Sequence, residues 1–420
     1  MSTGSFVTGS GGTTPVVRLK NMSTRALSKV FTQKALHFAW NTIYSKASSK
    51  GKNTAGIDDI SLNDFSWNQG TNLRNLWKDI HEHRFEFQAL RPFVIPKTDG
   101  NFRVIAVPTV QDRIVQRVLV DYLSERYKDV LSSKISYGFV KHKGVQQAAK
   151  AALNIRSHRP FVFKTDITKF FDNISRSLLK EQLKRVIRER SLHPILFAAI
   201  DCEIDEKDAR VKKLLKDVKR GRGLRQGMPL SPILSNIFLG PFDRAIHRAG
   251  YHAVRYADDL IFLANNREEC IEIAEFCRVE LQKLELRIPS LEEETKSLIY
   301  EPHEAADFLG LQIVRVKPRK NKYELQLSKK QREKIRDELL QLADIRLLNS
   351  KAILLKDLGR VINSRINGYM AVYSECSNFT ELSKELLNIE QKVLRRIYEN
   401  GLGIHIATLT PESRVFLGLK

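Results

Sequence analysis

Hydrophobic and polar positions follow two periods along this chain, and they divide it into a mixed centre and a helical end. Short apolar runs bounded by turn residues predict strands, and 3.6-residue spacing predicts helices. The expected strands are 91–97, 102–107, 161–166, the pair on either side of 257–258, and 306–317. The expected helices are 22–49, 110–130, 176–190, one after Pro229, 267–284, 329–348, 351–373 and 380–400. Strands interleaved with helices, followed by helices alone, predict an α+β fold with a separate helical C-terminal lobe.

The segment "HAVRYADDLIFLANN" at 252–266 breaks the hydrophobic pattern, because Asp258 and Asp259 interrupt an apolar run. An unpaired buried carboxylate costs several kcal/mol even after the protein relaxes, so something must compensate for it. Apolar residues on both sides fit a β-hairpin with the acids at or near its tip. Such a tip could present both carboxylates to a metal ion.

A third aspartate, Asp166, ends the strand predicted over 161–166. If that strand neighbours the hairpin in one sheet, Asp166 and Asp258 converge. Mg²⁺ prefers hard oxygen ligands and is held by one or two carboxylates together with substrate phosphates. Two such ions can activate an attacking oxygen and stabilise a leaving one. The pattern favours phosphoryl transfer, and a chance turn is the alternative.

The charge points to a polyanionic partner. The 420 residues include 70 Lys and Arg against 48 Asp and Glu, a net charge of +22. Such an excess is typical of nucleic-acid binding, although a basic surface or a membrane-surface protein remains an alternative. Residues 1–54 carry eight basic and no acidic residues, and 317–366 carry 14 basic and 6 acidic ones. Aromatic residues in the first segment could stack on bases or pack a helix against the protein: Phe31, Phe38, Trp40 and Tyr44.

The four cysteines lack the spacing of a zinc site, so reduced thiols used for packing are expected. The N-terminus lacks the apolar core of a signal peptide, and no apolar run is long enough to span a membrane. We therefore expect a cytoplasmic protein without a membrane partner.

Eight segments, in order, resemble the reverse transcriptases, particularly the bacterial group II intron-like ones. They are "AGIDDISLNDF" (55–65), "RPFVIPKTDGNFRVIAVPTVQDRIVQ" (91–116), "SYGFVKHKGVQQA" (136–148), "FKTDITKFFDNI" (163–174), "GLRQGMPLSPILSNI" (223–237), "RYADD" (255–259), "EETKS" (293–297) and "FLGL" (308–311). The resemblance implies a right-hand polymerase with an antiparallel palm sheet and a helical thumb. The implied domains are a basic N-terminal extension (1–54), fingers (55–160), palm (161–317) and a thumb-like lobe (318–420).

The resemblance also implies a role for individual residues. Asp166, Asp258 and Asp259 match the catalytic carboxylates, and the backbone carbonyl of Ile167 matches a further metal ligand. Two Mg²⁺ ions, which Mn²⁺ could replace, are the implied cofactors. The other matches are Lys97 and Arg103 (triphosphate grip), Phe171 (a ring that crowds a ribose 2′-OH, or a core residue), Gln226 (incoming nucleotide and template), and Leu309 and Gly310 (primer grip).

Two residues depart from the family pattern beside Gln226. Arg225 stands where proline is usual, and Met228 stands where a small residue is common. We therefore expect the template and primer geometry to differ there, while the catalytic carboxylates are unaffected.

Several features separate the kinds of reverse transcriptase. Because the chain ends at Lys420 and has no CxxC pair, we do not expect a zinc-containing endonuclease domain that cleaves target DNA. The "NAxxH" string of retron enzymes is also absent. What remains resembles a stand-alone, defence-associated bacterial reverse transcriptase, which implies copying of a cognate structured noncoding RNA into cDNA from dNTPs. The alternatives are a retron-type or intron-maturase-like enzyme, an RNA-binding scaffold, and an RNA-dependent RNA polymerase, which Phe171 disfavours. The sequence leaves the oligomeric state open.

Overall fold

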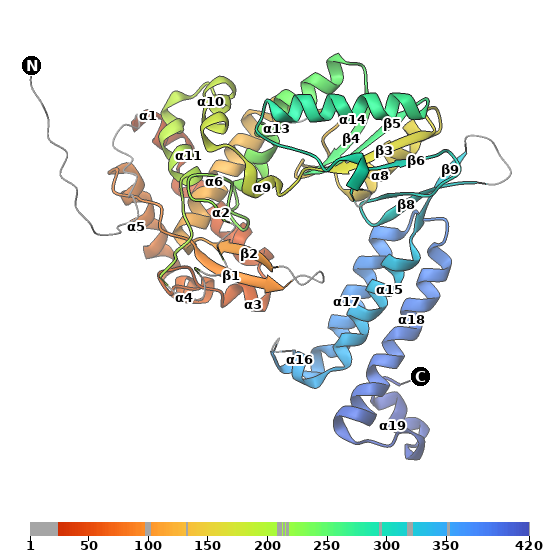
Figure 1. Ribbon diagram of the computed structural model, residues 1–420. Helices are drawn as coiled ribbons and strands as arrows, with labels where there is room; N and C mark the ends of the chain where they lie inside the picture. Colours follow the sequence, from red (N-terminus) through yellow and green to blue (C-terminus); the bar gives the residue numbers. More distant parts are fainter. Residues whose placement is uncertain are drawn as a thin grey trace, which may run out of the picture. The chain divides into compact units, whose positions relative to one another are not determined.

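The computed structural model consists of two compact units, each built from two stretches of the chain (Figure 1). The first unit joins Met1–Leu131 to Lys169–Gly240, and the second joins Ser132–Thr168 to Pro241–Lys420. The boundaries expected at 54, 160 and 317 remain a prediction. The described residues are 24–96, 102–131, 133–207, 212, 215, 218–293, 296–316, 322–350 and 353–419. Lys97 and the turn at 98–100 lie outside them.

The expected helix over 22–49 is wrong in one respect, because the first unit has two main helices there. They are α1 (Thr24–Val30) and α2 (Gln33–Lys46), with a short α3 (Ser49–Lys52) after them. Between α1 and α2, Thr32 has an extended backbone, and its hydroxyl oxygen accepts the N–H of Ala35 at 3.1 Å. This is an N-cap, which begins a new helix.

The aromatic residues of this N-terminal region mostly pack inside the first unit. Phe31 and Trp40 are 0% and 2% exposed, and the Trp40 ring lies 4.9 Å from that of Phe65. Their suggested role in stacking on bases is therefore wrong for these two residues. Phe38 remains 61% exposed.

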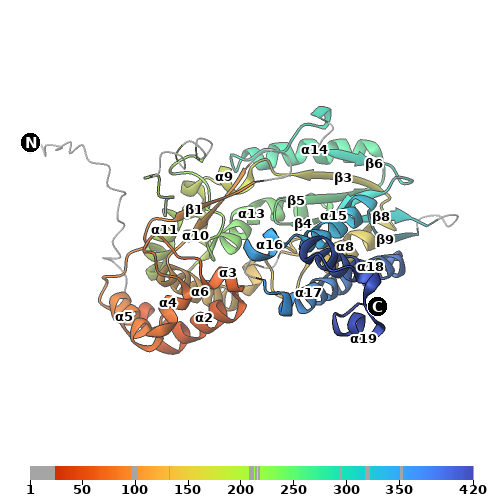
Figure 2. The ribbon, with the colours of Figure 1, turned by 90° about the horizontal axis from the view of Figure 1, so that it is seen from below.

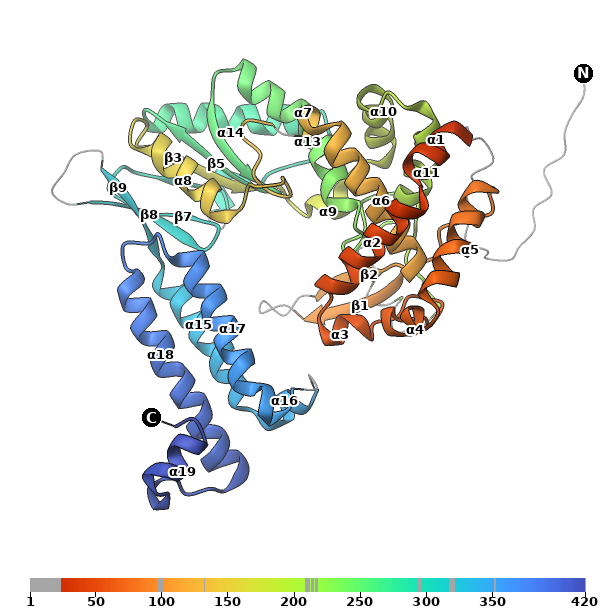
Figure 3. The same ribbon diagram turned by 180° about the vertical axis from the view of Figure 1, so that it is seen from behind.

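The first unit also contains a two-stranded hairpin, which lies at one side of its helices (Figure 3). In the hairpin, β1 (Arg91–Pro96) pairs antiparallel with β2 (Phe102–Val107), as the sequence predicts. The expected helix over 110–130 is divided into α6 and α7. The helices are α4 (Leu62–Trp67), α5 (Gln69–His81), α6 (Val110–Arg126), α7 (Lys128–Leu131), α9 (Phe170–Asn173), α10 (Arg176–Val186), α11 (His193–Ile200) and α13 (Ser231–Arg248), which continues into the second unit.

The palm sheet of the second unit is antiparallel, and its strand order is β4-β5-β3-β6. Its strands are β3 (Phe161–Asp166), β4 (His252–Tyr256), β5 (Asp259–Ala264) and β6 (Leu298–Tyr300). Helix α14 (Arg267–Gln282) covers one face and α8 (Val145–Arg156) covers the other (Figures 1 and 3). Two covered faces explain why β5 is almost entirely apolar after its first residue.

A second, three-stranded sheet lies beside α8 (Figure 2). The single strand expected over 306–317 is wrong, because the chain turns at Leu309–Gly310 and forms β7 (Ala306–Phe308) and β8 (Leu311–Arg315). Both turn residues have positive φ, 54° and 80°. Two left-handed residues allow a two-residue hairpin loop, which an apolar run alone does not signal. The third strand is β9 (Tyr323–Leu327).

The C-terminal part is helical, as expected, and shares one apolar core with α8 and both sheets of the second unit. The first expected helix, 329–348, is interrupted after Leu340. The helices are α15 (Lys329–Leu340), α16 (Ile345–Ser350), α17 (Leu355–Tyr373), α18 (Phe379–Arg396) and α19 (Pro411–Phe416). The expected α+β class, antiparallel palm sheet and helical thumb are confirmed. Among the helices in the described ranges, none has the length and apolarity needed to cross a membrane.

Candidate active site

The turn between β4 and β5 places two acidic residues at one end of the palm sheet. Tyr256 pairs with Asp259, so Ala257 and Asp258 alone form the loop. Ala257 has a left-handed backbone, with φ of 57°. A non-glycine residue pays about 1 kcal/mol for that conformation, so surrounding contacts must hold the turn.

The strand register brings the third aspartate to the same end. Asp166 is the cross-strand partner of Asp259 in the β3–β5 ladder. Directly opposite residues of neighbouring strands project to the same face of a sheet. The N–H of Ile167 donates to the carbonyl oxygen of Asp258 at 3.2 Å, which closes β3 against the turn. The structure therefore brings Asp166, Asp258 and Asp259 together, as the sequence predicts.

The electrostatics of this end show a concentration of negative charge. Burial, followed by the neighbouring charge of Asp258, raises the pKa of Asp259 to about 6. Lys296 partly compensates, because its Nζ donates to Asp166 Oδ2 at 2.8 Å. The hydrogen bond to Asp166 raises the pKa of Lys296, which keeps its ammonium group charged.

These residues fit a divalent cation by the type of their donor atoms. Asp166 Oδ1 is buried and has no hydrogen-bond partner among the described residues. A buried carboxylate oxygen without a partner is costly, and a hard cation would satisfy it. Within the described ranges, however, no three His, Cys, Asp or Glu side chains already form a group that could hold an ion. Lys296 instead takes the second oxygen of Asp166.

A buried ion pair supports the turn from behind. Arg255 donates to both carboxylate oxygens of Asp243, at 2.7 and 2.6 Å, and also to the carbonyl oxygen of Ala257 at 3.1 Å. Arg255 and Asp243 are only 1% and 3% exposed. Gly138 completes this support, since a Cβ there would lie 2.4 Å from the Ala257 nitrogen. The left-handed turn is thus held by the bidentate Arg255–Asp243 ion pair and by the close approach of the Gly138 backbone.

The residues expected to contact the nucleotide lie in the first unit. Phe171, on α9, is half-buried, and its ring packs edge-on against Phe170 with centroids 5.2 Å apart. Gln226 is half-buried, and its carbonyl oxygen accepts the N–H of Ala106 on β2 at 2.7 Å. Arg103 is exposed on β2. Their roles remain predictions, and Lys97 lies outside the described residues.

Helix α9, which carries Phe171, is hydrogen-bonded directly to the loop that carries Gln226. The N–H of Leu224 donates to the carbonyl oxygen of Phe171 at 2.8 Å. Gly223 has φ of 79°, and a Cβ there would lie 2.7 Å from the carbonyl oxygen of Asp172. The two backbones therefore touch at a position that only glycine can occupy.

The expected primer-grip residues form the tip of the β7–β8 hairpin in the second unit. Gly310 is exposed, and its Cβ position lies 3.5 Å from the Gln331 side chain at the start of α15. Leu309 is half-buried and packs against the shared core. Their contact with a primer remains a prediction.

Both departures from the family pattern are buried. Arg225 and Met228 are each only 4% exposed. Arg225 ion-pairs with Glu203, so its side chain is engaged inside the first unit.

Three residues of this site were not identified from the sequence as functional: Lys296, Arg255 and Asp243. Lys296 and Arg255 lie inside quoted motifs, "EETKS" and "RYADD", which is the signal that could have identified them. Asp243 is one acid on an amphipathic helix, and its sequence carries no such signal.

Comparison with known proteins identifies the family. The family described as "Reverse transcriptase (RNA-dependent DNA polymerase)" matches residues 95–313, about half of the chain. The COX1/OXI3 intron 2 protein of Saccharomyces cerevisiae is 28% identical over 54% of this chain and 25% of its own length. Protein YkfC of Escherichia coli is 25% identical over 65% of this chain and 79% of its own. The retron Ec83 reverse transcriptase of Escherichia coli is 29% identical over 42% of this chain and 53% of its own.

The match therefore spans a quarter of the yeast protein and about half of the retron enzyme. The matched region contains the three aspartates as well as Phe171 and Gln226. The resemblance to bacterial group II intron-like reverse transcriptases, drawn from the motifs, is confirmed by the family match and by relatives that include the group II intron-encoded protein LtrA of Lactococcus lactis. The chain belongs to the reverse transcriptase (RNA-dependent DNA polymerase) family.

Proposed function

We propose that this protein is an RNA-directed DNA polymerase, which extends a primer with deoxynucleotides on an RNA template. The observation that carries the proposal is the convergence of Asp166, Asp258 and Asp259 at one end of the palm sheet, inside the region that matches the family. Three like charges at one place raise the energy of the fold, which argues for a function that needs them.

Asp166, Asp258 and Asp259, with the carbonyl oxygen of Ile167, are the proposed ligands of two Mg²⁺ ions, for which Mn²⁺ could substitute. When bound, such ions neutralise phosphate charge and polarise the reacting oxygens. The protein's own part is positional: the β3–β5 register fixes two carboxylates side by side, and the Arg255–Asp243 pair holds the turn. Positioning and charge neutralisation supply most of the catalysis in phosphoryl transfer.

The remaining roles follow the family pattern. Lys97 and Arg103 are proposed to grip the triphosphate through charge-assisted hydrogen bonds. Phe171 is proposed to exclude the 2′-OH, Gln226 to contact the nucleotide, and Leu309 with Gly310 to hold the primer. The intact carboxylate set argues against a purely structural RNA-binding scaffold.

The direct experiment is primer extension on an RNA template. Purified protein is given a DNA primer with either dNTPs or NTPs, with Mg²⁺ or with EDTA. We expect extension with dNTPs and Mg²⁺ only. Extension with NTPs at an equal rate would favour an RNA polymerase, and no extension on any primed RNA would favour the scaffold.

We further propose a cognate structured noncoding RNA as template, in a cytoplasmic anti-phage defence system. The support is the positive charge outside the catalytic motifs, in 1–54 and in 317–366. Charge alone binds any RNA, whereas specific recognition uses loops, shape and stacked bases. Among the described aromatic side chains, Phe38 and Trp67 are 61% and 84% exposed and could supply stacking.

Sequencing the RNA and DNA that co-purify with the protein tests this partner. One enriched RNA, with complementary DNA, would support it, and an even sample of cellular RNA would contradict it. Deleting 1–54 is not a suitable variant, because α1 and α2 contribute core residues such as Leu27 and Leu36.

A further inference from the structure

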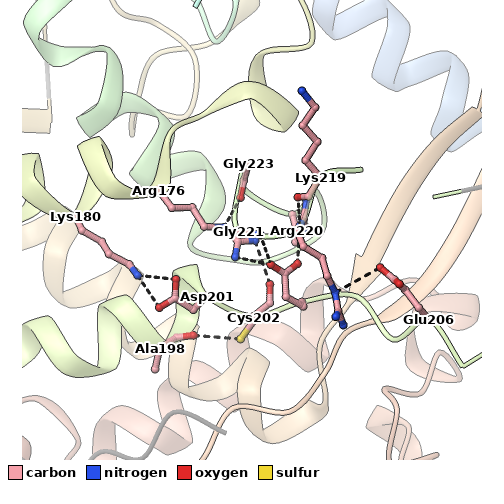
Figure 4. A network of polar contacts seen from close by, with 12 residues as sticks. Arg176, Lys180, Ala198, Asp201, Cys202, Glu206, Lys219, Arg220, Gly221 and Gly223 are labelled. Atoms are coloured by element: carbon pink, nitrogen blue, oxygen red, sulfur yellow. Dashed lines mark hydrogen bonds and ion pairs between the residues drawn. The ribbon is translucent and has the colours of Figure 1, made fainter. Parts of the chain in front are cut away.

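An acidic residue that is only 11% exposed, Glu203, accepts hydrogen bonds from several residues of a polar network in the first unit, and Figure 4 labels Arg176, Lys219 and Gly221 of that network. Its Oε1 accepts from Arg176 Nη1 at 2.7 Å and from the N–H of Gly221 at 2.8 Å. Its Oε2 accepts from Arg225 Nη2 at 2.5 Å. The side chains of Glu203, Arg176 and Arg225 are 11%, 5% and 3% exposed, so water does little to weaken these contacts.

The two arginines extend the network to the loop that precedes Gln226. Arg176 Nε donates to the carbonyl oxygen of Gly223 at 2.9 Å, and Arg225 Nη2 donates to that of Lys219 at 2.9 Å. Arg225 directly precedes Gln226. Residues 223 and 224 are in turn hydrogen-bonded to Ile174 and Phe171 through their N–H groups, both at 2.8 Å.

The backbone of Glu203 is fixed to a third part of the unit, the start of the β1–β2 hairpin. The N–H of Leu90 donates to the carbonyl oxygen of Glu203, and the N–H of Asp205 donates to that of Leu90, both at 2.9 Å. Leu90 directly precedes β1. The backbone of Glu203 therefore adjoins the hairpin, while its carboxylate binds the residues beside Phe171 and Gln226.

Arg225 gives a physical reason for this arrangement. A proline at this position would fix φ near about −65° and stiffen the loop by itself. Arginine leaves the backbone of the loop free, and the ion pair with Glu203 restrains it instead. Arg225 Nε, moreover, is buried without a hydrogen-bond partner among the described residues, so the guanidinium group depends on Glu203 and Lys219.

We propose that Glu203 is a positioning residue that sets helix α9 with Phe171 and the loop with Gln226 for nucleotide binding, acting through Arg176 and Arg225. This inference rests on the proposed polymerase function. Glu203 does not touch the reacting atoms; it restrains the residues that are expected to contact the nucleotide.

Steady-state kinetics on a primed RNA template test this role. Glu203→Gln removes the negative charge and keeps the shape, and Arg225→Lys keeps the positive charge but loses the planar guanidinium group, whose Nη2 donates to both Glu203 and Lys219. We expect both variants to raise the KM for dNTPs about tenfold with kcat within about twofold, because a misplaced loop weakens nucleotide binding first. Discrimination against NTPs should fall in parallel.

The matched control is Lys180→Gln. Lys180 lies on α10, as Arg176 does, and pairs with Asp201 at the end of α11. This pair is partly exposed, 26% and 32%, and its hydrogen bonds join Lys180 to Asp201 rather than to the 223–226 loop. We expect it to leave KM and discrimination unchanged. A folded Glu203→Gln protein with the parent's KM would overturn the proposal.

Hydrogen exchange provides a measurement that does not depend on activity. In the folded protein, Glu203→Gln should speed amide exchange in peptides covering 171–174 and 223–227, and Lys180→Gln should not. Unchanged exchange would overturn the proposal even if the parent makes no DNA. If Glu203→Gln fails to fold, Arg225→Lys carries the same comparison. A parent that makes no DNA on primed RNA, with altered exchange in the variants, would contradict the polymerase assignment alone.

Discussion

At the scale of single residues, the arrangement of the acidic site destabilises the fold. Asp166 and Asp259 are direct cross-strand partners, and like charges in that position destabilise a sheet. Lys296 offsets one of them through its ion pair with Asp166. The turn beside them keeps Ala257 in a left-handed conformation at φ of 57°. Strain and repulsion at one place are typical of a functional site.

Phe171 permits a test of sugar selection. Phe171→Ala should allow ribonucleotide incorporation to rise by at least about tenfold relative to dNTPs, because the ring is proposed to fill the space of the 2′-OH. The measurement is the ratio of kcat/KM for dNTP and NTP on one primed RNA. Phe170→Leu, at the buried neighbour, is the control for a general packing defect. If Phe171→Ala discriminates as strongly as the parent, Phe171 is a core residue.

Arg255 permits a test of the support behind the turn. Arg255→Lys keeps the charge but cannot bind both oxygens of Asp243 and the carbonyl of Ala257 at once. We expect DNA synthesis to fall about tenfold or more, with a lower melting temperature. Arg267→Lys, in the exposed pair with Glu301, should change neither quantity. Parent-like synthesis by Arg255→Lys would show that the turn does not need this ion pair.

At the scale of elements, the sequence predicts the parts whose signal is local. Alternating apolar residues identify β1, β2 and β3, and the run around Asp258 identifies the β4–β5 hairpin. The convergence of the aspartates follows because neighbouring antiparallel strands bring their ends together. The β7–β8 turn was missed because the apolar run continues through Leu309, a residue that rarely adopts positive φ.

Contacts between distant residues could not be predicted in the same way. Glu203 lies in a charged stretch that resembles a solvated surface, and only the fold brings it to Arg176 and Arg225, 27 and 22 positions away. Lys296 meets Asp166 across 130 positions. The two partners of an ion pair have no fixed spacing along the chain, so no pattern in the sequence predicts which residues will pair.

Helix α6 contains an acidic residue whose ionisation should weaken the fold. Asp112 is 1% exposed, and its Oδ1 has no hydrogen-bond partner among the described residues. Burial raises the pKa of Asp112 to about 7 from the model-peptide value of 3.8. The pKa of Asp112 is higher in the folded protein than in the unfolded chain, so the folded state holds the proton more tightly. The contribution of Asp112 to the free energy of unfolding is therefore complete below a pH of 3.8 and is lost as the pH rises through about 7.

Asp112→Asn removes the ionisable group without changing its shape. Above pH 7 the variant should be more stable than the parent, by an amount of the order of 1 kcal/mol or more, and the difference should shrink toward pH 4. Denaturant unfolding at a series of pH values measures this. Asp129→Asn, at an exposed position of the same unit, is the control. A stability difference that does not depend on pH would contradict the assignment.

At the scale of the whole molecule, charge is the dominant feature. The net charge of +22 resides partly in exposed residues of α2 and α15, such as Lys34, Lys46, Lys329 and Lys330. Other basic residues form ion pairs within the protein, as Arg332 does with Glu381 and Glu385 on α18. The exposed residues fit backbone contacts with nucleic acid, which fall steeply with salt and do not read sequence. Specificity for one RNA must therefore come from other contacts.

The most direct test of the central claim compares Asp259→Asn with Asp307→Asn, an exposed acid on β7 of the same unit. Extension of a DNA primer on an RNA template with dNTPs and Mg²⁺ is measured beside the melting temperature in EDTA. We expect Asp259→Asn to lose synthesis by about a thousandfold or more while melting no lower than the parent, because it removes one of three neighbouring like charges. Asp307→Asn should behave as the parent does. A folded Asp259→Asn protein that makes DNA at the parent's rate would contradict the account.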